Sequence, residues 1–403
     1  MGQTITILIA MKYPTDGLIT FSNCAKGDPR PLPSLFCIPQ AVQVLLMNAY
    51  VYRVHEWNDT TFTIRRTDRH ELVVLDGARR LRYVYMQRNP SVFQIYIHHC
   101  ALNGVPKTIR NLPELSKLTI RHCQLRYLDL NDFVSVPMLS VLDVSGNKIM
   151  SIVELATTAR TVALQQLYLA NNSLPLLNVS VFHGLTELRC LVLDGNRLER
   201  IESRLSLLTL EELSIRRNRL TTLDLTGWQL PALKFLFCNN NRLSTAPSGW
   251  TTLWQLETLD LSYNRLRGFC MDDLYLTQVR ALNLAANELT NITTTQARLH
   301  LPLERFQAPH NRLRVLDISH WSMPNLWDFN VKRNRLSALG DVFFRFPNIA
   351  STMDLGYNPW SCEWLRRVHP GDLRRKQYGC MSTNHECPEG RVMVEGNLWM
   401  CCW

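Results

Sequence analysis

A short motif of leucines and one asparagine recurs along this chain and limits its possible folds more than any other feature. Strings such as LSVLDVSGNKI at 139, LQQLYLANNSL at 164 and LETLDLSYNRL at 256 fit the pattern L-x-x-L-x-L-x-x-N/C-x-L. Twelve units follow one another at spacings of 22 to 25 residues. Their ninth position carries Asn or Cys, at residues 100, 123, 147, 172, 196, 218, 241, 264, 287, 311, 334 and 358. Such a period is typical of a solenoid, in which each unit buries its apolar face against its neighbours.

Each unit predicts the same local structure. The L-x-L segment, such as Leu167 and Leu169, alternates as a short strand with its apolar side chains facing inward. An Asn at the following turn, such as Asn264, can satisfy backbone groups that would otherwise be buried unpaired. Returning segments with an F-x-x-L pattern, such as Phe182-His-Gly-Leu185, predict a second apolar column. The expected fold is therefore an α/β repeat: a leucine-rich-repeat solenoid, or horseshoe, with a parallel β-sheet on its concave face and cysteine-containing caps at its ends.

The repeats set the expected domain boundaries. Residues 92–360 hold the repeats, and residues 24–91 are interpreted as an amino-terminal cap with one or two degenerate units. Residues 361–403 are interpreted as a cysteine-rich carboxy-terminal cap, because an uncapped terminal repeat would expose its core. Residues 1–23 resemble a weak or incomplete signal segment, with a short apolar run and no basic start. No run of 18 apolar residues occurs, so no transmembrane helix is expected.

The chain carries a formal net charge of +10, and arginines in two places explain much of it. One group directly follows the repeat Asn: Arg197, Arg219, Arg242, Arg265, Arg312 and Arg335. This group is read as a solvated edge stripe, with a basic rail for an acidic partner as the alternative. Exposed aromatic and basic residues are common at interface centres, so the concave face is the candidate binding site. Its expected members are Tyr96, His98, Arg121, Tyr168, Arg216, Arg217, Phe235, Phe237, Tyr263, Arg305, Lys332 and Arg333.

No pattern in the sequence favours catalysis or a cofactor. The chain contains no GxSxG, HExxH, GxxxxGK[ST] or GxGxxG motif, so an enzyme is not expected. The string His98-His99-Cys100 and the pair His122-Cys123 could be read as a metal cluster. The repeat register argues against it, because the cysteines face inward and the histidines outward, and no CxxC pair occurs.

Twelve cysteines and four glycosylation sequons favour an oxidising compartment and hence secretion. The sequons begin at Asn58, Asn171, Asn178 and Asn291. Cysteines at Cys100, Cys123, Cys190, Cys238 and Cys270 fall within the repeats and are predicted to be free thiols. Seven others are disulfide candidates of the two caps: Cys24, Cys37, Cys362, Cys380, Cys387, Cys401 and Cys402. Cys24 and Cys37 are a plausible pair, and four of the five carboxy-terminal cysteines can pair within their cap, which leaves one over. Either Cys401 or Cys402 is therefore expected to stay in the cap while the other faces a second chain.

Taken together, the repeats, the string NPWSCEWL at 358–365 and the terminal Cys401-Cys402 resemble the mosquito leucine-rich-repeat immune proteins. The resemblance implies a secreted haemolymph protein of innate immunity. It also implies a disulfide-linked leucine-rich-repeat partner, complement-like thioester proteins and microbial surfaces as binding partners. Members of that family usually continue into a coiled coil after the double cysteine, whereas this chain ends at Trp403 and so resembles the coil-less type.

Two other functions remain open from the sequence. The same repeats occur in ectodomains of cell-surface receptors and adhesion proteins, and in intracellular inhibitors or adaptors. The intracellular alternative predicts reduced cysteines and unoccupied sequons. In every case the partner is expected to be a protein or a microbial surface rather than a nucleic acid.

Overall fold

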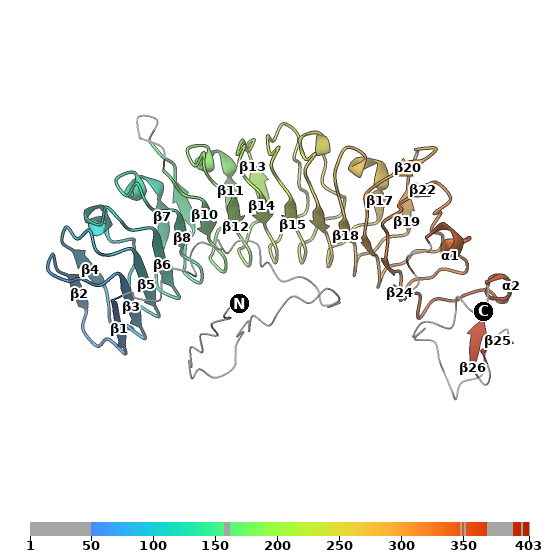
Figure 1. Ribbon diagram of the computed structural model, residues 1–403, viewed down its shortest axis with the longest axis horizontal. Coiled ribbons are helices and arrows are strands. Elements are labelled where there is room, and N and C mark those ends of the chain that lie inside the picture. Colours follow the sequence, from blue (N-terminus) through green and yellow to red (C-terminus); the bar gives the residue numbers. More distant parts are fainter. Residues whose placement is uncertain are drawn as a thin grey trace, which may run out of the picture. The chain divides into compact units, whose positions relative to one another are not determined.

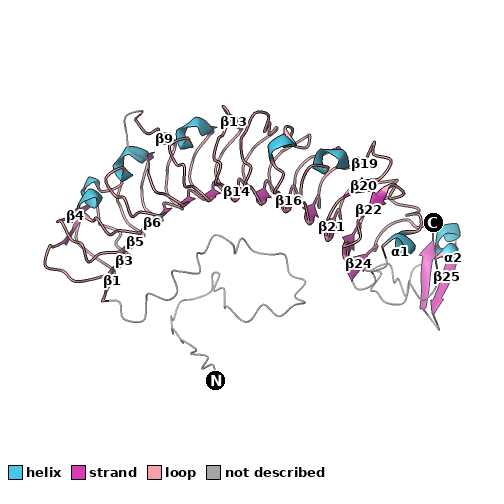
Figure 2. Cartoon of the chain, turned by 45° about the horizontal axis from the view of Figure 1, so that its top comes forward, coloured by secondary structure: helices cyan, strands magenta, loops and turns pink. Residues whose placement is uncertain are grey.

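A long parallel sheet runs through the repeats in this computed structural model, which describes residues 50–156, 162–346, 349, 352–368, 390–395 and 398–402. Fourteen strands pair in order of sequence, each with the equivalent strand of the next repeat. They line the inner side of the curved array (Figures 1 and 2). The strands are β1 (Val51–His55), β3 (Leu72–Asp76), β5 (Gln94–His98), β6 (Lys117–Arg121), β8 (Val141–Asp143), β10 (Gln166–Tyr168), β12 (Cys190–Val192), β14 (Glu212–Ser214), β15 (Phe235–Phe237), β16 (Thr258–Asp260), β18 (Ala281–Asn283), β21 (Arg305–Gln307), β23 (Asp328–Asn330) and β24 (Thr352–Asp354). The predicted leucine-rich-repeat solenoid is confirmed.

The register of the sheet stacks the strand leucines into one internal column. Leu213 pairs with Leu236, which pairs with Leu259, which in turn pairs with Leu282. All four side chains are buried, whereas the residues on either side of each leucine point to the other face of the sheet. The core is therefore continuous from repeat to repeat, and each repeat depends on its neighbours for burial.

Two strands upstream of residue 92 belong to the same sheet. Val73 of β3 pairs with Ile95 of β5, and Tyr52 of β1 pairs with Val73. Both strands keep the inward alternation although neither is followed by the repeat Asn. Near this end of the sheet, the rings of Trp57 and Phe62 pack edge to face with their centres 5.2 Å apart.

Buried asparagines join successive turns on the inside of the array. The Asn264 Oδ1 atom accepts from the backbone N–H of Leu243 at 3.0 Å, in the preceding repeat. Its Nδ2 atom donates to the carbonyl oxygens of Cys238 and Leu261 at 3.1 and 3.0 Å. The residue before the Asn adopts a left-handed backbone, as at Tyr263 with φ 54°. The amide side chain therefore hydrogen-bonds to backbone N–H and carbonyl groups of the turns that would otherwise be buried without a partner.

The outer side of the array carries short helices and two-stranded pairs (Figure 2). Phe182 and Leu185 are fully buried beneath them, which confirms the second apolar column. The outer strands are β2 (Thr61–Ile64) with β4 (Tyr83–Met86), β7 (Tyr127–Asp129) with β9 (Ser151–Val153), β11 (Leu176–Asn178) with β13 (Arg200–Glu202), β17 (Gly268–Cys270) with β19 (Asn291–Thr293), and β20 (Leu299–His300) with β22 (Trp321–Ser322). The helices are 3-10 segments at Lys107–Asn111, Leu130–Phe133, Val179–Phe182, Trp250–Thr252 and Met271–Leu274, followed by α1 (Val342–Arg345).

A tryptophan stack and a disulfide close the last repeat. The rings of Trp360 and Trp364 lie 4.5 Å apart, and α2 (Cys362–Arg367) begins where the Ser361 side chain accepts from the Trp364 N–H at 3.1 Å. Beyond it, β25 (Gly390–Glu395) and β26 (Leu398–Cys402) pair antiparallel. A disulfide joins Cys362 to Cys402, with Cα atoms 4.9 Å apart. Within the described part of the chain, no helix is long and apolar enough to span a bilayer.

Candidate functional site: the strand face

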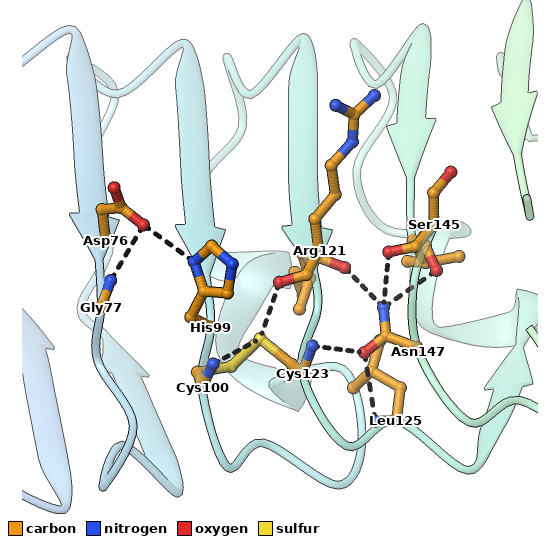
Figure 3. Close-up of a disulfide and its surroundings, with 11 residues drawn as sticks. Asp76, Gly77, His99, Cys100, Arg121, Cys123, Leu125, Ser145 and Asn147 are labelled. Carbon is orange, nitrogen blue, oxygen red and sulfur yellow. Dashed lines mark hydrogen bonds and ion pairs between the residues drawn. A yellow bond between two sulfur atoms is a disulfide. The ribbon is translucent and has the colours of Figure 1, made fainter. Parts of the chain in front are cut away.

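The first two repeat cysteines form a disulfide. Cys100 and Cys123 are bonded with their Cα atoms 4.5 Å apart (Figure 3). The prediction that both are free thiols is therefore wrong. Neighbouring parallel strands lie about 4.8 Å apart, and this spacing falls within the range that a disulfide bridges. The sequence signal for this bond was the presence of Cys at the same position of two consecutive repeats. Because both sulfur atoms are in the disulfide, neither remains as a ligand for the metal cluster considered from the sequence.

The remaining repeat cysteines divide into two kinds. Cys190 is also disulfide-bonded, so its prediction as a free thiol is wrong. Cys238 and Cys270 are free, as predicted. The Cys362–Cys402 bond confirms a disulfide within the carboxy-terminal cap. Five disulfide candidates have side chains outside the described residues: Cys24, Cys37, Cys380, Cys387 and Cys401.

The amino-terminal end of the strand face carries the predicted histidines and Arg121. The Arg121 Nε atom donates to Asp143 Oδ2 at 2.7 Å. The His99 Nδ1 atom lies 3.2 Å from Asp76 Oδ1 (Figure 3). The rings of His99 and His122 stack with centres 5.3 Å apart. His99, Arg121 and His122 thus lie at one end of the strand face, where Asp76 and Asp143 offset their charge. Sequence reasoning missed both carboxylates.

Within this cluster, Tyr96 and His98 project from β5. Their rings meet edge to face with centres 6.3 Å apart, and Lys117 lies 5.2 Å from the Tyr96 ring. The His98 Nε2 atom is buried, and no described group hydrogen-bonds to it. Burial lowers the pKa of His98, and the nearby Arg121 and His99 act in the same direction, against Asp76 and Asp143. His98 is therefore held as a neutral ring.

The centre of the face holds an arginine stacked on phenylalanine. The Arg216 guanidinium lies 3.9 Å from the centre of the Phe237 ring, which stacks on Phe235 at 6.4 Å. The Asp194 carboxylate accepts from the Arg216 backbone N–H at 2.9 Å and from the Ser214 hydroxyl at 2.6 Å. Burial raises the pKa of Asp194 in spite of these hydrogen bonds. This cluster brings together three residues that were predicted for the concave face, Arg216, Phe235 and Phe237, and all three are partly buried.

The carboxy-terminal end holds a second group of the same type. The Lys332 Nζ atom lies 3.0 Å from Asp354 Oδ2. Lys332 and Arg333 also face the Tyr357 ring, at 5.5 and 4.8 Å from its centre. Sequence reasoning named the two cations but not Asp354 or Tyr357. The other predicted members are placed on strands of the same face or in their turns: Tyr168 on β10, Tyr263 after β16, Arg217 after β14 and Arg305 on β21.

One geometric relation produces all three clusters. In each cluster the cation lies two positions after a strand residue, and it meets the residue that pairs with that strand residue on the next strand: Thr119 pairs with Asp143, Ser214 with Phe237 and Asn330 with Asp354. Arg121 meets Asp143, Arg216 meets Phe237, and Lys332 meets Asp354 in this way. Residues two apart share a face of a strand, and the register places the next strand alongside. Each cluster therefore bridges two repeats and is fixed by the sheet.

Comparisons with known proteins agree with this geometry. Residues 255–275 match the family model described as Leucine Rich Repeat. Podocan-like protein 1 of Mus musculus is 31% identical over 278 residues, which cover 63% of this chain and 47% of that protein. The solved LRIM1/APL1C complex is similar in fold, with a TM-score of 0.59 and 15% identity over 85% of this chain and 67% of that chain. The chain is a leucine-rich-repeat protein.

Two further relatives describe the extent of the likeness. The solved APL1 leucine-rich repeat domain has a TM-score of 0.56 at 17% identity, over 85% of this leucine-rich-repeat protein and 95% of that chain. At such identities the solved structures show the fold alone. Leucine-rich repeat-containing protein 66 of Homo sapiens is 25% identical over 273 residues, which cover 64% of this chain and 28% of that protein. The chain spans about half or less of the length of the two curated relatives named here.

The four sequons of this leucine-rich-repeat protein lie on exposed residues. Asn178 and Asn291 are at strands of the outer side, whereas Asn171 precedes the buried Asn172 at a turn of the main sheet. Asn58 follows β1. All four side chains are accessible to a glycan, and their occupancy stays a prediction.

Proposed function

We propose that the strand face binds a protein partner in the extracellular space, as part of innate-immune recognition or as a scaffold for it. The observation that carries the proposal is the pair of cation–aromatic clusters at Arg216–Phe237 and Lys332–Arg333–Tyr357. Aromatic and arginine side chains held rigidly in a row are the usual anchors of protein interfaces. Because the parallel sheet fixes them, little side-chain entropy would be lost on binding.

An oxidising compartment is supported by the disulfides. Cys100–Cys123, Cys362–Cys402 and the bond of Cys190 are of a kind that the cytosol keeps reduced. This favours a secreted protein or a cell-surface ectodomain over an intracellular adaptor. The resemblance to the mosquito immune proteins then adds microbial surfaces and complement-like thioester proteins as proposed partners.

The proposal includes a disulfide-linked partner, which follows from the odd number of cap cysteines and from the resemblance to the mosquito proteins. Cys402 bonds to Cys362 within the cap, as one of the terminal pair was expected to do. Cys190 is disulfide-bonded as well, so the number of cap cysteines alone does not require a second chain. Electrophoresis without reductant tests the covalent dimer.

The experiment compares two pairs of exposed aromatics. Tyr263→Ala with Tyr357→Ala removes side chains that are 61% and 48% exposed on the strand-face side. Tyr275→Ala with Phe344→Ala is the matched control, and these side chains lie outside the main sheet and are 51% and 90% exposed. Each protein is immobilised, the partners are recovered from body fluid, and the affinity of the purified partner is then measured.

We expect the strand-face pair to weaken binding about thirtyfold, which corresponds to roughly 2 kcal/mol for lost interface anchors. The control pair should bind like the unmodified protein. The opposite result, with binding lost only in the control, would place the site on the outer side.

A further inference from the structure

A row of arginines along one edge of the array is separate from the strand-face clusters. It consists of the residues directly after the buried Asn in the central and carboxy-terminal repeats, here called the arginine rail: Arg197, Arg219, Arg242, Arg265, Arg312 and Arg335. Each side chain is exposed although the Asn before it is buried. The corresponding positions nearer the amino terminus are Ala101, Gln124, Lys148 and Ser173. The rail therefore begins at the middle of the array.

The backbone of the rail is held by the repeat ladder. The Arg219 N–H donates to the Leu198 carbonyl oxygen at 2.8 Å, in the preceding repeat. The N–H groups of Arg242 and Arg265 make the same bond to the preceding leucine carbonyls, at 2.8 and 2.9 Å. Successive arginines thus leave the scaffold from equivalent points, one repeat apart.

The charge of the rail is mostly uncompensated. Arg312 pairs with Glu288 at 3.2 Å, and Arg219 lies 3.9 Å from Glu199. Among the described residues, no carboxylate lies within 4 Å of the guanidinium nitrogens of the other four rail arginines. Two exposed arginines outside the strand face lie beside the rail in sequence and add further charge: Arg267 and Arg314. Glu288 is the one acidic residue that takes a rail position.

Holding like charges side by side on neighbouring repeats is unfavourable, and an extended polyanion would relieve it. Guanidinium groups bind sulfate and carboxylate in a bidentate geometry and remain charged at every physiological pH. A nucleic acid fits less well, because single-strand sites add a platform of stacked aromatics. Next to the rail, at the turns before the Asn, Tyr263 and Tyr357 are the exposed aromatics among the described residues, and four repeats separate them.

We propose that the arginine rail binds a linear acidic polysaccharide, such as a sulfated glycan, along the edge of the array. The choice of a glycan over a nucleic acid rests on the proposed extracellular location. The binding itself does not rest on the strand-face function, because the two surfaces share no residue. A glycan on the rail would leave the strand face open for its protein partner.

The test measures binding of a heparin oligosaccharide to the full chain at several salt concentrations. The rail variant Arg242→Ser, Arg265→Ser and Arg335→Ser removes three exposed side chains for which the structure shows no ion pair. The control Arg79→Ser, Arg80→Ser and Arg82→Ser removes the same charge from exposed residues near the amino-terminal end. We expect about tenfold weaker binding for the rail variant, less than about twofold for the control, and a shallower salt dependence for the rail variant alone.

A gain-of-function variant guards against a folding artefact. Glu288→Arg completes the rail, and we expect it to bind the oligosaccharide more tightly than the unmodified chain. Equal losses in the rail and control variants, or no binding by the unmodified chain at physiological salt, would overturn the proposal. Tighter, rail-dependent binding of polyuridylate than of heparin would replace the glycan by a nucleic acid. None of these results depends on the partner of the strand face.

Discussion

The disulfide between Cys100 and Cys123 and the asparagines that follow it occupy the same position of the repeat but join the turns differently. Asn147 satisfies backbone groups on both sides of its turn: its Oδ1 accepts from the N–H groups of Cys123 and Leu125, and its Nδ2 donates to the Ile120 and Val144 carbonyls. The disulfide instead links two turns covalently and offers the Cys100 N–H one sulfur at 3.2 Å. The difference teaches that this position must connect neighbouring repeats, and that either a hydrogen-bonded or a covalent link suffices.

The largest expected effect comes from breaking an asparagine link in the middle of the array. Asn264→Ala leaves the Leu243 N–H without its side-chain partner and removes one hydrogen bond from each of the Cys238 and Leu261 carbonyls, which still accept from Asn241 and Asn287. A buried unpaired group costs about 1–3 kcal/mol and each lost hydrogen bond about 1 kcal/mol, so we expect the free energy of unfolding to fall by roughly 4 kcal/mol. Chemical denaturation measures it, with the exposed Asn103→Ala as control. A loss below about 1 kcal/mol would show that water replaces the amide.

The covalent link should be nearly as important in an oxidising solution. Replacing Cys100 and Cys123 by Ser removes a closed loop of 23 residues, which stabilises the chain by about 3 kcal/mol in the chain-entropy treatment. We expect this loss in the double variant, and a larger loss when the unmodified protein is treated with reductant, which also opens the Cys362–Cys402 bond and the bond of Cys190. Unchanged stability in the double variant would mean that the two links are not equivalent.

A substitution of one link by the other tests the comparison directly. Cys100→Asn with Cys123→Asn should recover part of the lost stability, because each Asn can take up the donor and acceptor roles seen at Asn147. This variant should also lose the sensitivity of that region to reductant. If it is no more stable than the Ser variant, the local backbone of the first repeats requires the disulfide.

The same comparison explains what the sequence could predict. The leucine period identified the solenoid, the inward strand residues and the role of Asn264, because these follow from a pattern that repeats. The Cys100–Cys123 bond was also encoded, since equivalent positions of adjacent repeats must lie one strand spacing apart. It was missed because each cysteine was read within its own repeat. The pairs Arg121–Asp143 and Lys332–Asp354 needed the diagonal relation between repeats, which depends on the register of the sheet and the directions of individual side chains.

The smallest expected effect is a change in stability with pH. It distinguishes the first repeats, which carry the histidines, from the centre of the array, where asparagines link the turns. Burial lowers the pKa of His98 in the folded chain below the ordinary histidine value of about 6.5. The unfolded chain therefore binds more protons than the folded one as the pH falls below about 6.5, and stability should decrease through the folded pKa. His98→Gln removes this titration, so its melting temperature should change less between pH 7 and pH 5 than that of the unmodified chain. His183→Gln, at an exposed histidine on the outer side, serves as the control for replacing a histidine elsewhere in the array. If His98→Gln and the unmodified chain lose the same stability on acidification, the pH sensitivity arises elsewhere, and the buried ring of His98 is protonated without cost.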